Sequence, residues 1–368
     1  MKILFVITGL GLGGAEKQVC LLADKLSLSG HHVKIISLGH MSNNKVFPGE
    51  NNVNVINVNM SKNISGVIKG CVRIRDVIAN FKPDIVHSHM FHANIITRLS
   101  VIGIKNRPGI ISTAHNKNEG GYFRMLTYRI TDCLSDCCTN VSKEAVDEFL
   151  RIKAFNPAKA ITMYNGIDTN KFKFDLLARR EIREGINIKN DDILLLAAGR
   201  LTLAKDYPNL LNAMTLLPEH FKLIIIGDGE LRDEINMLIK KLQLSNRVSL
   251  LGVKKNIAPY FSACDIFVLS SRWEGFGLVV AEAMSCERIV VGTDSGGVRE
   301  VIGDDDFLVP ISDSTQLASK IEKLSLSQIR DHIGFRNRER ILKNFSIDTI
   351  IMQWQELYGT IICSKHER

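Results

Sequence analysis

The chain has 368 residues, of which 45% are hydrophobic, 23% are charged and 8 are proline. A single hydrophobic core stops growing at about 250–300 residues, so this length predicts two domains of roughly 180 residues each. The composition excludes a disordered, collagen-like or low-complexity chain. No apolar run approaches the ~20 residues that a membrane-spanning helix needs.

The net charge of +8 belongs to one half of the chain. Residues 1–178 contain 22 Lys and Arg against 13 Asp and Glu, a net charge of +9, whereas residues 179–368 contain 25 against 26. A one-sided positive field attracts phosphate groups, nucleic acid or an anionic membrane surface. Motifs of nucleic-acid-binding folds are absent, which leaves phosphates or a membrane as partners, beside the simpler interpretation of a solvated basic surface.

The eight cysteines lie mostly in apolar segments and lack the paired spacing of metal ligands. We expect free thiols in a reducing environment, which predicts a cytoplasmic location that includes the inner face of the plasma membrane. The apolar run Ile3–Ile7 is too short for a signal peptide, and glycines follow it at once. It therefore predicts a first buried strand.

In the first half, short apolar runs alternate with helical patterns, which is typical of a parallel α/β domain. The predicted strands are Lys2–Ile7, Val33–Leu38, Val53–Val58, Asp84–His87, Gly109–Thr113, Cys137–Asn140 and Ala160–Tyr164. The predicted helices between them are Ala15–Leu28, Ile64–Asn80 and Ala93–Ile102. Each of these helices ends at or just before a glycine or a proline.

The first strand leads into a glycine-rich loop in which Gly9, Gly11 and Gly14 satisfy the dinucleotide pattern G-x-G-x-x-G. An NAD-dependent dehydrogenase also needs an acidic residue at the end of the second strand, and the residues there, 37–40, are Ser-Leu-Gly-His. Glycines at a helix N-terminus expose backbone N–H groups. We therefore predict an anion near Gly13 and Gly14, with a ligand-free turn as the alternative.

Two further features of the chain resemble metal ligands. His87 and His89 point the same way from one strand and His92 follows, but no Asp, Glu or Cys accompanies them. We interpret them as structural or acceptor-side histidines. Asp304–Asp306 follow a glycine in a loop, and we interpret them as a solvated turn. The sequence thus predicts no metal site.

A predicted helix over Tyr122–Arg129 mixes aromatic residues with arginines in the basic half. This mixture fits contact with an anionic membrane surface or with a lipid-linked acceptor. A core-packing helix with solvated arginines is an equal alternative.

The second half begins with a charged segment, Lys171–Asn190, which lacks a strand pattern and is predicted to carry the linker. A second α/β cycle follows. Its predicted strands are Ile193–Ala198, Lys222–Ile226, Val248–Leu251, Ile266–Leu269, Ile289–Val291 and Phe307–Val309, and its predicted helices include Pro208–Leu217, Glu230–Leu242 and Gly277–Ser285. An amphipathic helix over Ile347–Ile362 is expected to pack back across the domain junction. We predict domains at 1–175 and 176–345 and a C-terminal crossover helix and tail at 346–368.

The strand Ile193–Ala198 runs into a loop that carries Arg200 and Lys205. Arginine offers a planar fork of donors and lysine a compact charge, a combination that suits a diphosphate. Solvated surface cations are the alternative.

Two glutamates follow the strand Ile266–Leu269: Glu274 lies in the loop and Glu282 in the next helix. Eight helical residues rise about 12 Å, too far for the ~5–5.5 Å carboxyl pair of a retaining glycosidase. The pair suits one long ligand held at two points. Between the two acids, residues 275–278 place backbone N–H groups at a helix N-terminus, where phosphate binds well.

Taken together, these features resemble glycosyltransferase family 4, whose members are retaining enzymes of the GT-B fold. The resemblance rests on Glu274 and Glu282 with seven residues between them, and on the loop from Gly199 to Lys205. It also rests on Gly-Gly-Ala-Glu at 13–16 and Asn-Gly-Ile-Asp at 165–168. These matches fall in order from residue 1 to about residue 300. The pattern is most similar to bacterial O-antigen or capsule polysaccharide enzymes.

The resemblance implies roles for the charged residues of the second half. Arg200 and Lys205 would hold the diphosphate of a nucleotide-sugar donor, Glu282 would bind the ribose hydroxyls, and Glu274 would bind a hydroxyl of the transferred sugar. In the family a glycine often follows this lysine. Here the residue is Asp206, whose negative charge would weaken phosphate binding.

The resemblance also implies contacts from backbone groups and from the first half. Phe276, Gly277 and Leu278 would offer backbone donors to sugar and phosphate, and Gly14 would approach the phosphates from the opposite wall. His115 matches the family's active-site histidine, which lies close to the transferred sugar.

For the whole chain, the resemblance implies two doubly wound, Rossmann-like parallel-sheet domains that face each other across a cleft. The implied reaction moves a sugar from a nucleotide-diphosphate sugar, with UDP favoured, to a saccharide acceptor linked to polyprenyl diphosphate. It proceeds with retention of configuration and without a metal, and it belongs to lipopolysaccharide O-antigen or related polysaccharide biosynthesis. Charge on the leaving phosphate is stabilised electrostatically.

Three other functions remain open from the sequence. A nucleotide-sugar epimerase of a related two-domain fold would convert the donor without an acceptor. An NAD-dependent dehydrogenase would bind nicotinamide, and a sugar-binding protein would never release the nucleotide. The transferred sugar, the linkage and the choice of nucleotide are not fixed by the sequence.

Overall fold

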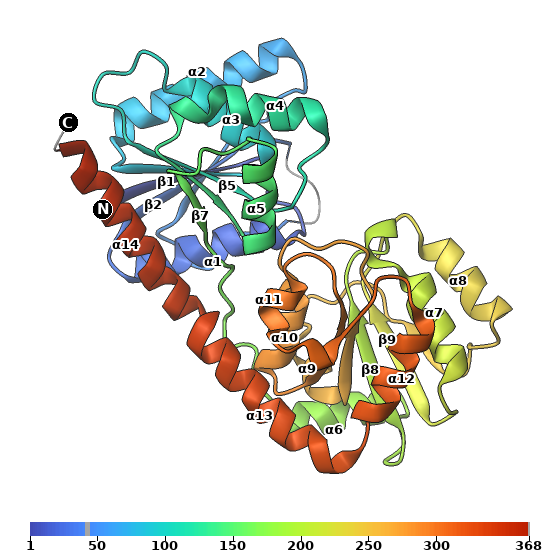
Figure 1. The fold of residues 1–368 in the computed structure, drawn as a ribbon. Helices are drawn as coiled ribbons and strands as arrows, with labels where there is room; N and C mark the ends of the chain where they lie inside the picture. Colours follow the sequence, from blue (N-terminus) through green and yellow to red (C-terminus); the bar gives the residue numbers. More distant parts are fainter. Residues whose placement is uncertain (41–44, 367–368) are drawn as a thin grey trace. The chain divides into compact units, whose positions relative to one another are not determined.

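The computed structural model describes residues 1–40 and 45–366, which form two units, each built around one parallel sheet (Figure 1). The first unit comprises Met1–Gly166 together with Ile347–Arg368, and the second unit comprises Ile167–Ser346. The chain therefore leaves the first unit once and returns to it at its C-terminal end. The prediction of two doubly wound parallel-sheet domains is confirmed.

The first unit has a seven-stranded sheet in the order β3-β2-β1-β4-β5-β6-β7. Its strands are β1 (Lys2–Ile7), β2 (His32–Ser37), β3 (Asn54–Asn57), β4 (Ile85–His89), β5 (Gly109–Ala114), β6 (Cys137–Asn140) and β7 (Ala160–Thr162). Its helices are α1 (Gly14–Leu28), α2 (Ile64–Phe81), α3 (Phe91–Ser100), α4 (Tyr122–Thr131), the 3-10 turn η1 (Asp132–Leu134), α5 (Lys143–Arg151) and α14 (Ile347–His366).

The second unit has a six-stranded sheet in the order β10-β9-β8-β11-β12-β13. Its strands are β8 (Ile193–Ala198), β9 (Phe221–Ile226), β10 (Val248–Leu250), β11 (Ile266–Leu269), β12 (Ile289–Thr293) and β13 (Leu308–Val309). Its helices are α6 (Leu176–Gly185), η2 (Leu203–Lys205), α7 (Tyr207–Leu216), α8 (Arg232–Lys241), α9 (Ala258–Ala263), α10 (Leu278–Ser285), α11 (Val298–Ile302), η3 (Asp305–Phe307), α12 (Ser314–Leu324) and α13 (Ser327–Asn344).

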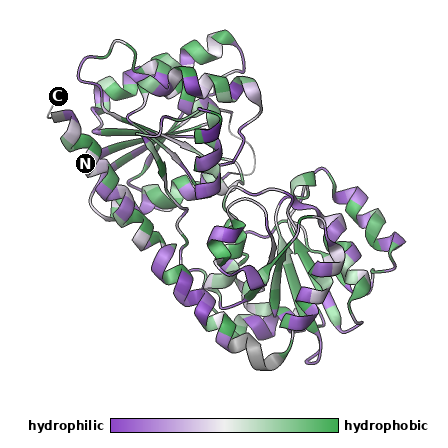
Figure 2. Ribbon diagram, in the orientation of Figure 1, coloured by the Kyte–Doolittle hydropathy of each residue, from purple (hydrophilic) through white to green (hydrophobic). Residues whose placement is uncertain are grey.

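Each predicted strand is present, with ends that differ from the prediction by one or two residues at most. These strands are continuous apolar runs because helices cover both faces of a parallel sheet. In β1, Phe5 packs with α1 and α14 on one face, and Leu4 and Val6 pack with α2 and α3 on the other. Figure 2 shows the strands of both sheets as the hydrophobic centres of their units.

The C-terminal helix α14 belongs to the core of the first unit. Trp354 and Tyr358 are buried against the face of the sheet that α1 also covers. Asp348 forms an ion pair with Lys25 of α1 at 3.2 Å. A helix from the far end of the sequence therefore completes one side of the N-terminal domain.

The prediction that Lys171–Asn190 carries the linker is wrong, because this segment contains α6 and belongs to the second unit. The Asp175 side chain caps the N-terminus of α6. Arg179 and Arg183 form ion pairs with the buried carboxylate of Asp265 at 2.6 and 3.0 Å. The charges of this segment hold a helix in place; they do not solvate a linker.

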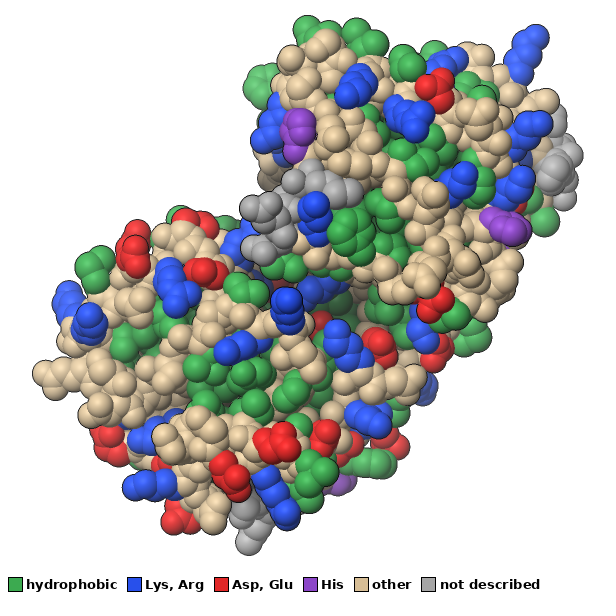
Figure 3. All heavy atoms as spheres, turned by 180° about the vertical axis from the view of Figure 1, so that it is seen from behind, with side chains coloured by type: hydrophobic (Ala, Val, Ile, Leu, Met, Phe, Trp, Pro, Cys, Tyr) green, Lys and Arg blue, Asp and Glu red, His purple; other side chains and the backbone are tan. Residues whose placement is uncertain are grey.

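The charge asymmetry follows the two units. The first unit contains 22 Lys and Arg against 14 Asp and Glu, and the second contains 25 of each. On the face seen in Figure 3, Lys and Arg predominate over the first unit, whereas acidic and basic side chains are mixed over the second. The positive field is therefore a property of the first unit.

Candidate functional site

The second unit brings together two of the predicted site residues, Lys205 and Glu274. Strands β8 and β11 are neighbours and run parallel, so the loops that follow them lie at the same edge of the sheet. The Lys205 ammonium forms an ion pair with Glu274 Oε1. The hydroxyl of Ser271 donates a hydrogen bond to the same oxygen at 2.6 Å. The cation and the carboxylate therefore fix each other's position.

Backbone contacts lock the two loops together around this ion pair. The Ser270 hydroxyl donates to the carbonyl of Lys205, and the backbone N–H of Arg272 donates to the carbonyl of Ala204, both at 2.8 Å. A Cβ at Gly199 would lie 2.8 Å from Cε of Lys205, so the lysine side chain passes directly over the glycine. A larger residue at Gly199 would displace the ammonium.

Asp206 is buried and its carboxylate is already paired. Nε of Arg272 lies 3.0 Å from Asp206 Oδ2, and the Ser312 hydroxyl donates to the same oxygen at 2.6 Å. Asp206 has φ +45°, a left-handed conformation that glycine adopts at less cost. Arg272 thus offsets the charge of Asp206, which the sequence alone shows beside Lys205 without a partner.

Arg200 differs from Lys205, because no side chain in the described part of the chain pairs with it. It directly follows Gly199 at the end of β8 and its side chain is exposed. Across residues 1–40 and 45–366, its guanidinium makes no ion pair or hydrogen bond. This fork of donors is available to an external anion.

The helix α10 begins directly after the predicted phosphate-binding residues. Gly277 precedes it with φ +87°, and Phe276 is buried with its ring 5.6 Å from that of Phe345. At the start of α10 the backbone N–H groups of Val280 and Ala281 donate to the carbonyl of Gly277, which leaves the N–H groups of Leu278 and Val279 without intrahelical acceptors. Glu282 lies on the same helix and is 8% exposed.

In the first unit, Gly13 and Gly14 form the start of α1, as the sequence predicts. Gly13 is the N-cap and Gly14 the first helical residue. A Cβ at Gly13 would lie 2.1 Å from Oε2 of Glu16, so a larger residue there would require this carboxylate to move.

His115 follows β5 and belongs to a buried polar network. Its Nε2 lies 3.0 Å from Nδ1 of His89 on β4, and its backbone N–H donates to Glu119 Oε1 at 2.9 Å. Glu119 also accepts a hydrogen bond of 2.5 Å from the Tyr128 hydroxyl. Burial lowers the pKa of His115 to about 4 and raises the pKa of Glu119. His115 is therefore neutral at physiological pH.

His87 has a structural role. Its Nδ1 lies 2.8 Å from the Tyr358 hydroxyl of α14, and its Nε2 lies 2.6 Å from Thr113 Oγ1. Burial and the neighbouring His115 hold the pKa of His87 well below its usual range. His92 is exposed. This supports the interpretation of His87 as a structural residue that ties α14 to the sheet.

Two aspartates of the predicted turn form ion pairs with arginines. Asp304 pairs with Arg336 at 2.8 Å, and Asp305 pairs with Arg299. Within the described part of the chain, no group of three or more His, Cys, Asp or Glu side chains is placed to hold a metal ion.

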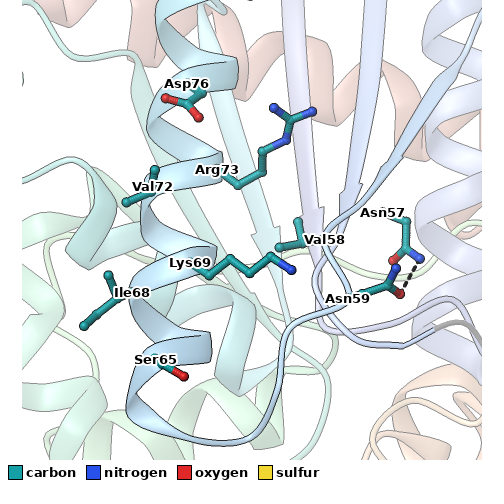
Figure 4. Close-up of a pocket in the computed structure, with 9 residues that line it drawn as sticks. All are labelled: Asn57, Val58, Asn59, Ser65, Ile68, Lys69, Val72, Arg73 and Asp76. Carbon is teal, nitrogen blue, oxygen red and sulfur yellow. Dashed lines mark hydrogen bonds between the residues drawn. The ribbon is translucent and has the colours of Figure 1, made fainter.

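A groove of about 630 Å³ lies in the first unit between α2 and the residues at and after the end of β3 (Figure 4). Lys69 points from α2 toward Asn59, which follows β3, whereas Arg73 points toward the strands of the sheet. None of the sequence-predicted site residues lines this groove; its lining residues are Asn57, Val58, Asn59, Ser65, Ile68, Lys69, Val72, Arg73 and Asp76.

The predicted amphipathic helix over Tyr122–Arg129 is present as α4 and has two different faces. Met125 and Tyr128 are buried in the core, whereas Tyr122 and Phe123 are 75% and 81% exposed. One part of this helix therefore packs in the core, while two aromatic side chains at its N-terminal end face solvent.

Two family models match consecutive parts of the chain. Residues 12–171 match the model "Glycosyltransferase Family 4", and residues 178–342 match "Glycosyl transferases group 1". Together these matches cover both units of the structure. The chain belongs to glycosyltransferase family 4.

A relative and two solved structures are similar to this chain over nearly its whole length. The glycosyltransferase is 28% identical to N-acetyl-alpha-D-glucosaminyl L-malate synthase of Bacillus anthracis, over 97% of this chain and 95% of the relative. Sucrose-phosphate synthase of Thermosynechococcus elongatus shares its fold, with a TM-score of 0.88 and 20% identity over 99% and 100% of the two chains. Anabaena HepE, solved in complex with UDP, gives a TM-score of 0.83 and 22% identity over 98% and 100%. The GT-B fold is thereby confirmed.

Sequence reasoning missed two side chains that shape this glycosyltransferase's candidate site, Ser271 and Arg272, and did not foresee the contact between His89 and His115. Ser271 holds Glu274, Arg272 neutralises Asp206, and His89 contacts His115. Ser271 and Arg272 stand beside Glu274 in the sequence, but nothing there reveals which neighbours face it. The sequence does indicate which way His89 faces, because side chains alternate along a strand and His89 therefore lies on the same side of the sheet as His87.

We expect the free energy of unfolding of the first unit to fall as the pH drops below 6.5. Burial lowers the pKa of His115 to about 4 and holds those of His87 and His89 below 6.5, so the unfolded chain binds protons that the folded chain does not. Each such group costs up to about 1.4 kcal/mol per pH unit between its two pKa values. Urea unfolding between pH 7.5 and pH 5 measures this slope.

Trp354 fluorescence reports on the first unit if Trp273, the other tryptophan of the chain, is replaced by phenylalanine. In that background, His115→Gln removes one titrating group and should reduce the slope. A free energy of unfolding that is independent of pH in this range would contradict the burial of neutral histidines.

Proposed function

We propose that the protein transfers a sugar from a nucleoside-diphosphate sugar, with retention of configuration, to a lipid-linked saccharide in bacterial surface polysaccharide synthesis. The observation that carries the proposal is the pairing of Lys205 with Glu274 at the strand ends of the second unit, beside the exposed Arg200. This arrangement supplies two cations for a diphosphate and a carboxylate for sugar hydroxyls.

In this proposal the donor is bound by the second unit. Arg200 donates two hydrogen bonds to phosphate oxygens, and Lys205 adds a point charge. Glu274 accepts from a hydroxyl of the transferred sugar, and Glu282 accepts from the ribose. The backbone N–H groups of residues 276–278 add donors at the N-terminus of α10. Phosphate and sugar are thus addressed by different side chains.

Catalysis in this proposal is electrostatic. The bond between the anomeric carbon and the phosphate oxygen breaks, and the acceptor oxygen forms the new bond on the same face of the sugar. The acceptor's proton passes to the leaving phosphate. Arg200 and Lys205 stabilise the charge that grows on that phosphate, so no carboxylate acts as a nucleophile and no metal is required.

The names of relatives support the choice of substrates. A Campylobacter jejuni relative, 27% identical over 98% of this chain and 99% of its own, is named as a transferase that extends a saccharide on PP-undecaprenol. An Escherichia coli relative, 23% identical over 83% of both chains, is named as a UDP-Gal-dependent galactosyltransferase acting on a diphosphoundecaprenol-linked sugar. We therefore propose a UDP-sugar donor and an acceptor carried on polyprenyl diphosphate.

The surface of the first unit supports peripheral contact with an anionic membrane, where such an acceptor resides. Ile64, Ile68 and Val72 recur every fourth residue along α2 and are 81%, 58% and 51% exposed. They form an apolar stripe on one face of the helix. Lys69 and Arg73 extend from the other side over the groove (Figure 4), and within the described residues neither pairs with a carboxylate.

Such a combination of exposed aliphatic and basic side chains is typical of helices that lie in the membrane interface. The exposed Tyr122 and Phe123 of α4 add aromatic side chains of the kind that enter the headgroup region. No helix within residues 1–40 and 45–366 has both the length and the apolar content of a membrane-spanning segment. Contact in this proposal is therefore superficial and strengthened by anionic lipid.

We expect Arg200→Ala to weaken donor binding roughly 10- to 100-fold, because hydrogen bonds to charged groups contribute about 1.5–3 kcal/mol. Glu282→Gln should weaken it through the loss of a carboxylate acceptor. Calorimetric titration with nucleotide sugars, and the rate of sugar transfer, measure these effects. Arg180→Ala is the matched control, because this arginine is exposed on α6 and has no partner among the described residues.

Three results of these assays would separate this proposal from the alternatives. Donor binding by Arg200→Ala that equals that of Arg180→Ala would contradict the site assignment. Conversion of the donor in the absence of an acceptor would indicate an epimerase. The anomeric proton coupling of the product, measured by NMR, reports retention or inversion.

We expect flotation with liposomes to depend on anionic lipid and on α2. The double variant Lys69→Glu/Arg73→Glu should reduce binding at least tenfold, since each basic residue near an anionic surface contributes about 1 kcal/mol and a reversed charge is repelled. The control is Arg180→Glu/Lys240→Glu, which reverses two exposed charges of the second unit. Equal binding by both double variants would exclude α2 as the membrane contact.

A further inference from the structure

His89 is a buried histidine that is hydrogen-bonded on one side only. Its Nδ1 lies 3.0 Å from Nε2 of His115, while its Nε2 is buried and finds no hydrogen-bond partner among residues 1–40 and 45–366. The ring of His87 lies 4.1 Å away and that of Phe5 lies 5.7 Å away, centroid to centroid. These neighbours cover His89 and leave its second nitrogen without an acceptor or a donor.

The contact between His89 and His115 admits two placements of a single proton. If His89 Nδ1–H donates, its buried Nε2 carries only a lone pair. If His115 Nε2–H donates instead, the neutral His89 must carry its own proton on Nε2, as a buried N–H without an acceptor. Unpartnered buried N–H groups are rarer in proteins than under-satisfied acceptors. The first placement is therefore favoured.

The opposite nitrogen of His115 does not share this constraint. His115 is half-buried, and its Nδ1 makes no hydrogen bond with residues 1–40 or 45–366. His115 Nδ1 is therefore not a buried atom without a partner: it is accessible at the surface of the first unit. Water or a ligand therefore reaches Nδ1, so either protonation state can be satisfied there. The tautomer of His115 is therefore determined by its contact with His89.

We propose that His89 is a positioning residue that donates its Nδ1–H to His115 and thereby holds His115 as the Nδ1–H tautomer. His115 then presents a hydrogen-bond donor to an oxygen of the bound substrate, such as a sugar hydroxyl or a phosphate oxygen. This inference rests on the proposed function only in placing His115 beside the substrate. The tautomer itself follows from the buried contact.

The consequence for the reaction is that His115 does not act as a general base. Both of its nitrogens are committed, one accepting from His89 and the other carrying the donating proton. This agrees with the low pKa that burial gives His115, because such an imidazole accepts a proton weakly near neutral pH. The proton of the acceptor hydroxyl must then leave by another route, which in the proposed reaction is the leaving phosphate.

The imidazole nitrogens of the histidine-labelled full-length protein, observed by long-range proton–nitrogen NMR, test the tautomer directly. The His115 signals are identified by their loss in His115→Gln. We expect His115 Nδ1 to resonate as a protonated nitrogen and Nε2 as an unprotonated one between pH 6 and pH 8. The reverse pattern would overturn the proposal, and so would a charged ring. Neither result depends on finding a substrate, so the outcome is separate from that of the proposed function.

A pair of substitutions at His89 tests its positioning role. An asparagine places its side-chain N–H close to the position of the histidine Nδ1–H, whereas a leucine removes the donor. We expect His89→Asn to preserve the His115 tautomer, and His89→Leu to produce a mixture of tautomers. In the transfer assay, kcat of His89→Leu should fall about tenfold or more with little change in KM, and His89→Asn should recover most of that loss.

Circular dichroism and urea unfolding of both variants show whether each is folded. Equal kcat values for two folded variants would indicate that His89 only fills space, and would overturn its positioning role. If His89→Leu does not fold, the His115 tautomer in the unsubstituted protein and in His89→Asn decides the question. Loss of the Nδ1–H pattern in a folded His89→Asn would also contradict the proposal.

Discussion

The ion pair between Lys205 and Glu274 determines the geometry of the candidate donor site. It joins the loops after β8 and β11, and Ser271 holds the same carboxylate oxygen. Because Lys205 passes over Gly199, the position of the ammonium also depends on the absence of a side chain there. The neighbouring Arg200 differs, since its side chain is exposed to solvent. Prearranged charges of this kind lower the cost of reorganisation when a charged ligand binds.

The first unit uses buried polar groups in a comparable way. One face of its sheet is covered in part by α14, whose Tyr358 hydrogen-bonds to His87 on β4. Two residues further along the strand, His89 contacts His115. The histidine that resembles the family's active-site residue is thus oriented by a strand that is itself anchored to the C-terminal helix. Two side chains of one strand thus contact α14 and His115.

Much of the fold could be predicted because the strands are short, continuous apolar runs with helices between them. The loops that carry Arg200, Lys205 and Glu274 could be located for the same reason, since ligands bind at the carboxyl ends of parallel strands. The partners of these side chains could not be predicted from the sequence. The sequence shows Asp206 as an unpaired charge, and only the fold brings Arg272 and Ser312 to it. Likewise, the charged sequence of α6 resembles a linker, because the partner of its Arg179, Asp265, lies far away in the sequence.

The most direct test of the central claim compares a nucleoside diphosphate with the matching monophosphate by titration calorimetry. If Lys205 and Arg200 hold the terminal phosphate, the unsubstituted protein should bind the diphosphate at least tenfold more tightly than the monophosphate. In Arg200→Ala/Lys205→Met that preference should largely disappear while the monophosphate still binds. An unchanged preference in the double variant would contradict the assignment of the diphosphate to these two cations.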